Sequence, residues 1–203
     1  MENHQKILSS YLSYLPSSDN PLSAEVFFIK GNESTYIYDV GANDESLRQI
    51  NQIKNKKIIL SHFHQDHTAN IHHIAWEKLY VDKKTCNYIG KGDMVNEKIE
   101  ISDGVTLEII PTVTSHSKIA LLLNVNYEYL LTGDALYSIM VDGKEAYNVQ
   151  LLKETIATLK VIKTKKVVLS HDSQLIYPVE EILAELEGYY SKREKDNPFI
   201  FIK

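Results

Sequence analysis

The chain has 203 residues, of which 43% are hydrophobic and 24% are charged, and its formal net charge is −5. This length suffices for one domain of ordinary size, so we expect residues 1–203 to form a single domain. The acidic balance argues against a broad nucleic-acid surface, which is normally basic. Because Cys86 is the only cysteine, an intrachain disulfide is excluded.

The sequence also bears on location. The first twenty residues lack a basic segment followed by a long apolar run, and the apolar stretch at 119–125 is too short to cross a bilayer. We therefore expect a cytoplasmic protein.

The first half of the chain predicts mostly strands. Residues 5–15 carry a helical apolar pattern that ends at Pro16. After this segment we expect a hairpin of two strands (24–30 and 34–40), a helix (44–53), a strand buried on both faces (56–60), a short helix (69–76) and a strand (78–82).

The second half alternates strands with longer helices. We expect strands at 98–102 and 106–113, a hairpin of 119–125 and 128–134 around Asn126-Tyr127, an amphipathic helix at 148–163, a buried strand at 165–170, a helix at 178–193 and a last strand at 198–203. Hairpins followed by alternating helices and strands predict packed sheets with helices outside.

Two short segments resemble each other. KKIILSH (56–62) and KKVVLSH (165–171) match at every position if isoleucine and valine are exchanged. Each is a predicted buried strand that ends in a histidine. This is the pattern expected of an α/β sandwich with pseudo-twofold symmetry whose halves supply one site.

The first of these segments opens a histidine cluster. Alternate residues of an extended chain point the same way, so His62 and His64 can bind one metal ion together. If the chain then turns, Asp66 and His67 can face a second ion. Imidazole and carboxylate ligands suit zinc, iron or manganese.

Three later residues lie at predicted strand ends and complete the set. His116 precedes the strand at 119–125, Asp134 ends the next strand, and His171 ends the segment KKVVLSH. Ligands in α/β folds bind outside the carboxyl ends of strands, so these residues are candidate metal ligands too. The set provides three ligands for each of two ions and one bridging carboxylate.

The stretch S-H-F-H-Q-D-H resembles the H-x-H-x-D-H signature of the metallo-β-lactamase superfamily, and the later residues follow in that family's order. The resemblance implies an α/β fold, an αβ/βα four-layer sandwich of two mixed β-sheets with helices on the outer faces. It assigns seven metal ligands, with His62, His64 and His116 on the first ion, Asp66, His67 and His171 on the second, and Asp134 as the bridge.

The same resemblance matches Asp39-Val40-Gly41 to the Asp-x-Gly that the family carries after its first hairpin. We expect Asp39 to support the metal-binding loops, with simple turn chemistry as the alternative. The contexts of residues 68–70, 115–118 and 169–172 depart from the family's usual glycine-rich patterns, and the specificity loops carry no substrate signature.

We expect a metal-dependent hydrolase with two divalent ions, zinc above iron or manganese. A hydroxide bridging them would cleave a small ester, thioester or lactone, with Asp66 as the catalytic residue that orients it. The alternatives are a phosphodiesterase acting on a nucleotide and a mononuclear iron dioxygenase of the same fold. His64 weighs against the diiron oxygen-reducing branch, which usually has a glutamate there.

The expected partner is a small-molecule substrate, with no nucleic acid or membrane, and a homodimer is allowed. Two tyrosines, Tyr137 and Tyr177, are candidates to stabilise an oxyanion, with packing as the alternative role. His72 and His73 are expected to lie at the surface or behind the ligands.

Overall fold

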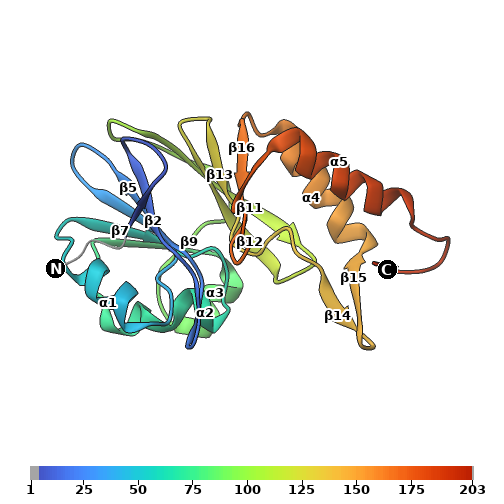
Figure 1. Cartoon of the computed structure of the whole chain (residues 1–203), viewed down its shortest axis with the longest axis horizontal. Coiled ribbons are helices and arrows are strands. Elements are labelled where there is room, and N and C mark those ends of the chain that lie inside the picture. The colour runs from blue at the N-terminus through green and yellow to red at the C-terminus, as the bar shows by residue number, and fades with distance from the viewer. Residues whose placement is uncertain (1–4, 203) are drawn as a thin grey trace.

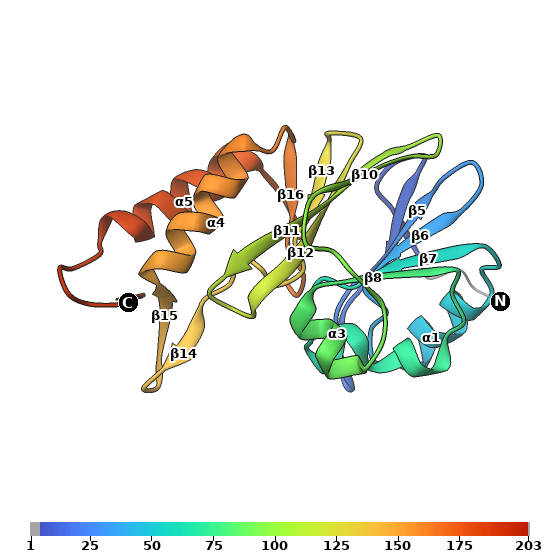
Figure 2. The ribbon, with the colours of Figure 1, turned by 180° about the vertical axis from the view of Figure 1, so that it is seen from behind.

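Two mixed β-sheets packed face to face form the centre of the computed structural model, which describes residues 5–202 (Figure 1). Lys203, the end of the last predicted strand, lies outside these residues. Helices cover the outer face of each sheet, as Figure 2 also shows from behind. The predicted four-layer αβ/βα sandwich is therefore confirmed.

The first sheet has the order β1-β2-β5-β6-β7-β8-β9. Its strands are β1 (Lys6–Ile7), β2 (Leu12–Leu15), β5 (Val26–Lys30), β6 (Thr35–Tyr38), β7 (Lys56–Ile59), β8 (Lys78–Val81) and β9 (Asp93–Met94). The predicted hairpin of β5 and β6 is antiparallel, whereas β6, β7 and β8 run parallel. The helices on its outer face are α1 (Asp44–Asn51), α2 (Gln65–Thr68), the 3₁₀ helix η1 (Ala69–His73) and α3 (Lys83–Ile89).

The second sheet has the order β10-β11-β12-β13-β16-β17. Its strands are β10 (Ile99–Ser102), β11 (Thr106–Thr114), β12 (Lys118–Val125), β13 (Tyr129–Leu131), β16 (Lys166–Val168) and β17 (Ile176–Pro178). Two helices, α4 (Val149–Val161) and α5 (Val179–Ser191), pack on its outer face. The remaining strands are the short pair β3 (Ser18–Asp19) and β4 (Leu22–Ser23), and a small sheet of β14 (Ile139–Val141), β15 (Lys144–Asn148) and β18 (Phe199–Phe201).

Each main sheet is buried on both faces. Residues such as Phe27, Leu121 and Leu123 form the core between the sheets, and separate apolar clusters lie under the two helical layers. This arrangement explains the apolar run at 58–60, where β7 ends, since positions covered on both sides of a sheet favour apolar side chains. Burial on this scale is the main stabilising contribution to the fold.

The helix predicted over residues 5–15 is wrong, because β1 and β2 occupy this segment. Leu12 and Leu15, three residues apart, gave a helical pattern. In an extended chain residues three apart point to opposite faces. Leu12 indeed lies in the core between the sheets, while Leu15 lies in the core under the first helical layer.

Other boundaries differ from the predictions. The helix expected at 69–76 begins four residues earlier as α2, and η1 ends at His73. The sequence prediction also missed α3, although Asp82 caps its start and Gly90 ends it in the left-handed conformation with φ 75°. The hairpin of β14 and β15 was missed too, despite the Asp142-Gly143 turn signal.

The remaining predicted elements are present close to their expected positions. The turn between β12 and β13 has positive φ at both Asn126 (52°) and Tyr127 (55°), and the Glu128 N–H closes it by donating to the Val125 carbonyl at 3.0 Å. Within residues 5–202, no helix is both long and apolar enough to cross a membrane.

Candidate metal centre

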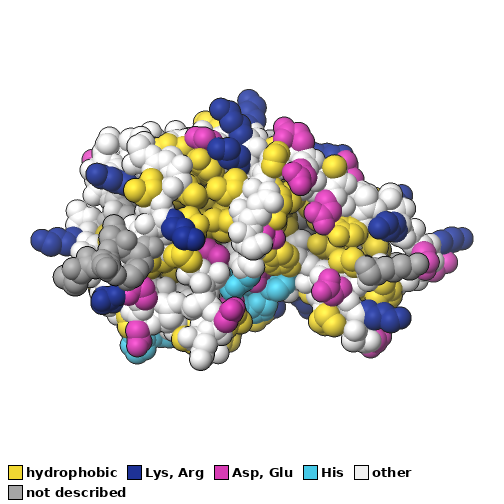
Figure 3. All heavy atoms as spheres, in the orientation of Figure 1, with side chains coloured by type: hydrophobic (Ala, Val, Ile, Leu, Met, Phe, Trp, Pro, Cys, Tyr) yellow, Lys and Arg dark blue, Asp and Glu magenta, His cyan; other side chains and the backbone are white. Residues whose placement is uncertain are grey.

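The seven predicted site residues meet at one edge of the sandwich, between the two sheets. His62 follows β7 and His171 follows β16, so the two matching segments supply the same site from opposite sheets. The turn between β11 and β12 carries His116, and Asp134 follows β13. Figure 3 shows histidine side chains (cyan) in an indentation between the two halves of the molecule.

The first cluster consists of His62, His64, His116 and Asp134, whose ligand atoms all lie within 4.8 Å of one another. His116 Nε2 is 3.1 Å from His64 Nδ1 and 3.5 Å from an Asp134 oxygen. Nitrogen and oxygen atoms converging at this spacing could hold one metal ion.

The second cluster consists of Asp66, His67, Asp134 and His171, again with ligand atoms within 4.8 Å of one another. His171 Nε2 is 2.9 Å from Asp66 Oδ2, and His67 Nε2 is 3.3 Å from Asp134 Oδ1. Because Asp134 belongs to both clusters, its carboxylate lies between two potential ion positions.

Several inward-facing atoms at this site are buried and have no hydrogen-bond partner. They are His62 Nε2, His67 Nε2 and Asp134 Oδ1, of which the last two lie 3.3 Å apart without the geometry of a hydrogen bond. Buried polar atoms are nearly always satisfied, so three orphaned atoms at one point need an explanation. A bound cation satisfies all three, and the donor set of imidazoles and carboxylates fits zinc, iron or manganese. The residues present therefore form a multi-residue site suited to metal binding.

Asp39 supports this site from behind, as predicted. Its fully buried carboxylate accepts the Ser61 N–H at 2.7 Å and lies 2.7 Å from His67 Nδ1. Ser61 Oγ lies 2.9 Å from His62 Nδ1. These contacts engage the outer nitrogen of each imidazole and leave the inner nitrogen for a ligand, which is how histidine ligands are usually oriented.

The turn Thr132-Gly133-Asp134 needs glycine at its centre for a structural reason. Gly133 has φ 52°, and a Cβ there would lie 2.6 Å from Ser61 Oγ. The turn must therefore pass directly against the loop after β7, and this close approach brings Asp134 beside the histidines.

The protonation of the histidines follows from burial and neighbours. Burial, and then the nearby His67, lower the pKa of His62 well below its ordinary range, which favours the neutral form that binds metals. Burial alone would also lower the pKa of His67, but the carboxylates of Asp39 and Asp134 raise it well above that range. A metal ion at the second cluster would therefore compete with a proton for His67 Nε2.

The structure identifies a supporting residue that the sequence did not suggest. Glu25, 4% exposed, accepts the backbone N–H of His171 at 3.0 Å. His171 has φ 60°, a left-handed conformation that is uncommon for residues other than glycine. Glu25 therefore stabilises the strained loop that presents His171. The only feature of the sequence that could have pointed to Glu25 is its position as a charged residue in the apolar segment AEVFFIK.

Other sequence candidates lie outside the two clusters. The Tyr137 hydroxyl donates to the Ser170 carbonyl, and the Tyr177 hydroxyl donates to Asp172 at 2.7 Å. Both rings pack against the core of the second sheet. His72 and His73 are exposed on η1.

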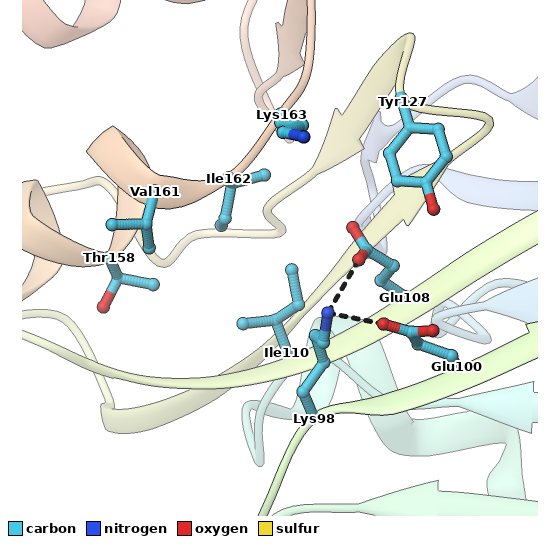
Figure 4. Close-up of a pocket in the computed structure, with 9 residues that line it drawn as sticks. All are labelled: Lys98, Glu100, Glu108, Ile110, Tyr127, Thr158, Val161, Ile162 and Lys163. Atoms are coloured by element: carbon cyan, nitrogen blue, oxygen red, sulfur yellow. Dashed lines mark hydrogen bonds and ion pairs between the residues drawn. The ribbon is translucent and has the colours of Figure 1, made fainter.

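A hollow of about 850 Å³ lies elsewhere, between β10, β11 and the end of α4 (Figure 4). None of its lining residues belongs to either cluster. Its Lys98 is paired with Glu100 at 2.6 Å and Glu108 at 3.0 Å. The charge in this hollow is thus largely neutralised by its own residues.

No protein-family model matches the sequence, and no curated protein sequence matches it either. Solved structures do resemble the fold. A chemotaxis sensor determined as its peroxy diiron species has a TM-score of 0.67 and 14% identity, and the match covers 92% of this chain and 95% of that one. An archaeal metallo-β-lactamase superfamily protein from Sulfolobus tokodaii has a TM-score of 0.60 and 17% identity, with 93% and 90% covered.

A stereoselective inverting sec-alkylsulfatase from Pseudomonas sp. gives a TM-score of 0.71 at 13% identity. That match covers 92% of this chain but only 41% of the sulfatase.

Fold and site together define a protein with a metal-binding site at the edge of an αβ/βα sandwich. The chain has the metallo-β-lactamase fold, and the resemblance carried by its H-x-H-x-D-H signature is confirmed.

Proposed function

We propose that the protein is a dinuclear metal-dependent hydrolase that cleaves a small ester, thioester or lactone. The observation that carries the proposal is the convergence of seven histidine and aspartate side chains, three of whose inward atoms are buried without partners. We assign His62, His64 and His116 to the first ion, Asp66, His67 and His171 to the second, and Asp134 to both.

Two divalent ions, most simply zinc, would lower the pKa of water and polarise the bond to be cleaved. The protein's own residues would position the reactants. Asp66 keeps 16% of its side chain exposed, more than His67 or Asp134, so it can accept a hydrogen bond from an incoming water. Asp39 and Ser61 would hold the imidazoles of His67 and His62 in the orientation that ligand binding needs.

The substrate class is tested with zinc-loaded protein and a panel of a thioester, a lactone, an aryl ester, a bis-aryl phosphodiester and a β-lactam. We expect turnover of one of the first three, lost in His116→Ala and Asp134→Ala while the fold remains. Turnover of the phosphodiester alone would favour the nucleotide phosphodiesterase instead. Full activity in either variant would contradict the ligand assignment.

Iron redox chemistry is the second candidate. The observation that favours it is the likeness to structures described as a peroxy diiron species and as flavo di-iron proteins. If the protein carries out iron redox chemistry, iron-loaded protein will consume oxygen and zinc-loaded protein will hydrolyse none of the substrates in the panel. One iron per chain in the purified protein would favour the mononuclear dioxygenase.

A further inference from the structure

An aromatic surface adjoins the first cluster on the side of α3. Phe63, which lies between two of the proposed ligands in the sequence, places its ring 4.5 Å from the ring of His64. The ring of Tyr88 is 5.8 Å from the Phe63 ring, and Tyr88 is 57% exposed. This pair offers a molecule at the metal site an accessible apolar surface.

Two lysines accompany this surface. The Lys84 ammonium lies 3.7 Å from the centre of the Phe63 ring and donates to the Ser117 carbonyl at 3.1 Å. Ser117 is the neighbour of His116, and Lys118, the first residue of β12, follows it. Burial, and then the charge of Lys118, lower the pKa of Lys84, while the carboxylate of Asp82 raises it, so both charges act on the Lys84 ammonium.

Within the described part of the chain, neither of these two lysines is held in an ion pair, whereas Lys98, Lys160 and Lys166 are. Lys98 in the distant hollow is paired with two glutamates (Figure 4). Among the described residues, no carboxylate lies within ion-pair distance of Lys84 or Lys118. Two neighbouring cations with only the carboxylate of Asp82 acting against them leave a net positive charge at this turn, which attracts anions.

The backbone at Lys118 gives an independent indication. Its φ is 73°, a left-handed conformation that glycine or asparagine adopts more easily than lysine. The turn is held in this shape, because Ser117 N–H donates to Thr114 Oγ1 at 3.0 Å and Ser117 Oγ donates to the Ile119 carbonyl at 2.8 Å. Strained residues of this kind concentrate at functional sites.

We propose that the substrate carries an oxyanion group, a carboxylate or a phosphate, beside an apolar segment. Lys84 and Lys118 bind the oxyanion, and Phe63 with Tyr88 contacts the apolar segment. The inference rests on the proposed function for the scissile bond, which lies at the metal clusters. The Phe63 ring is 4.5 Å from the His64 ring and 3.7 Å from the Lys84 ammonium. Because only this one ring separates His64 from Lys84, a single small molecule can reach both.

Binding is tested first, without turnover, by calorimetric titration of zinc-loaded protein with three benzyl compounds. Phenylacetate and benzylphosphonate are anionic, and phenylacetamide is the neutral match. We expect the anions to bind about tenfold more tightly than the amide, and Lys118→Gln to remove most of this preference. The tighter of the two anions identifies which oxyanion the site prefers.

The matched control is Lys83→Gln, which removes the same charge from the neighbouring exposed position of α3. Zinc content is measured in each variant, and Lys84→Gln provides a second test of the site. Equal binding of anions and amide by the wild type, an anion preference that persists in both Lys84→Gln and Lys118→Gln, or an equal effect of Lys83→Gln would overturn the proposal.

Turnover separates this inference from the proposed function. The two substrates are mono-4-nitrophenyl glutarate and its neutral methyl ester. We expect kcat/KM to favour the anionic substrate about tenfold in the wild type and to approach equality in Lys118→Gln. If neither ester is hydrolysed while the anion preference in binding holds, the hydrolase proposal fails and the oxyanion site stands. Equal hydrolysis of both, with equal binding, refutes only the oxyanion site.

Discussion

The role of Asp39 gives the sharpest prediction at the level of a single atom. Its carboxylate makes two contacts of 2.7 Å from a fully buried position, one with the Ser61 N–H and one with His67 Nδ1. In Asp39→Asn, the amide oxygen can still accept from Ser61. The amide nitrogen can only donate toward His67, which favours the imidazole with its proton on Nε2, where a metal ion would bind.

Asp39→Asn is expected to change both the stability of the fold and the affinity for metal. Replacing the charged hydrogen bond between Asp39 and His67 by a neutral one destabilises the fold by about 1–3 kcal/mol. The contact to Ser61 is retained and adds no cost. Affinity for the second metal ion falls about 10- to 100-fold, while affinity for the first changes little, since His62 is supported by Ser61 rather than by Asp39.

The assay is a zinc titration in competition with a chromophoric chelator, fitted for two binding steps. Asp103→Asn is the matched control, because it makes the same acid-to-amide change at a carboxylate that belongs to neither metal cluster. Two unchanged binding steps in Asp39→Asn, or two steps weakened equally, would refute the reasoning.

Three further predictions concern the supporting structure. Glu25→Ala removes the acceptor of the His171 N–H and is expected to weaken the second zinc step about tenfold in the same titration; an unchanged step would show that the loop needs no such support. Leu123→Ala, fully buried between the sheets, is expected to lower the free energy of unfolding in urea by about 2–5 kcal/mol, and a loss below about 1 kcal/mol would contradict the assigned core. Burial alone would raise the pKa of Asp103, but the N–H groups of Glu33 and Ser34 lower it. Its stabilising effect is therefore fully present above its unfolded pKa of about 3.9 and is lost as pH falls below it, so acid unfolding curves of Asp103→Asn should lack this part of the pH dependence.

The metal-binding region was predictable from sequence because its residues occur in short, regular patterns. His62 and His64 alternate at the end of an apolar strand, and KKVVLSH repeats that arrangement before His171. A buried strand followed by polar ligands depends on local chain geometry, which the sequence carries directly. Asp39 could be identified for the same reason, through its short motif with Gly41.

The residues that the sequence did not reveal depend on contacts between distant segments. Glu25 meets His171 across 146 positions of the chain, and Lys84 meets Ser117 across 33. No local pattern encodes such pairings. The error over residues 5–15 has a related cause, since only the presence of apolar layers on both faces of the first sheet makes Leu12 and Leu15 compatible with a strand.

The central claim is that seven side chains hold two metal ions through a shared Asp134. Equilibrium dialysis against zinc, followed by elemental analysis, tests it most directly. We predict two zinc ions per chain in the wild type and at most one in Asp134→Ala, because the variant loses the carboxylate common to both clusters. Two zinc ions retained in Asp134→Ala, or no more than one in the wild type, would contradict the account.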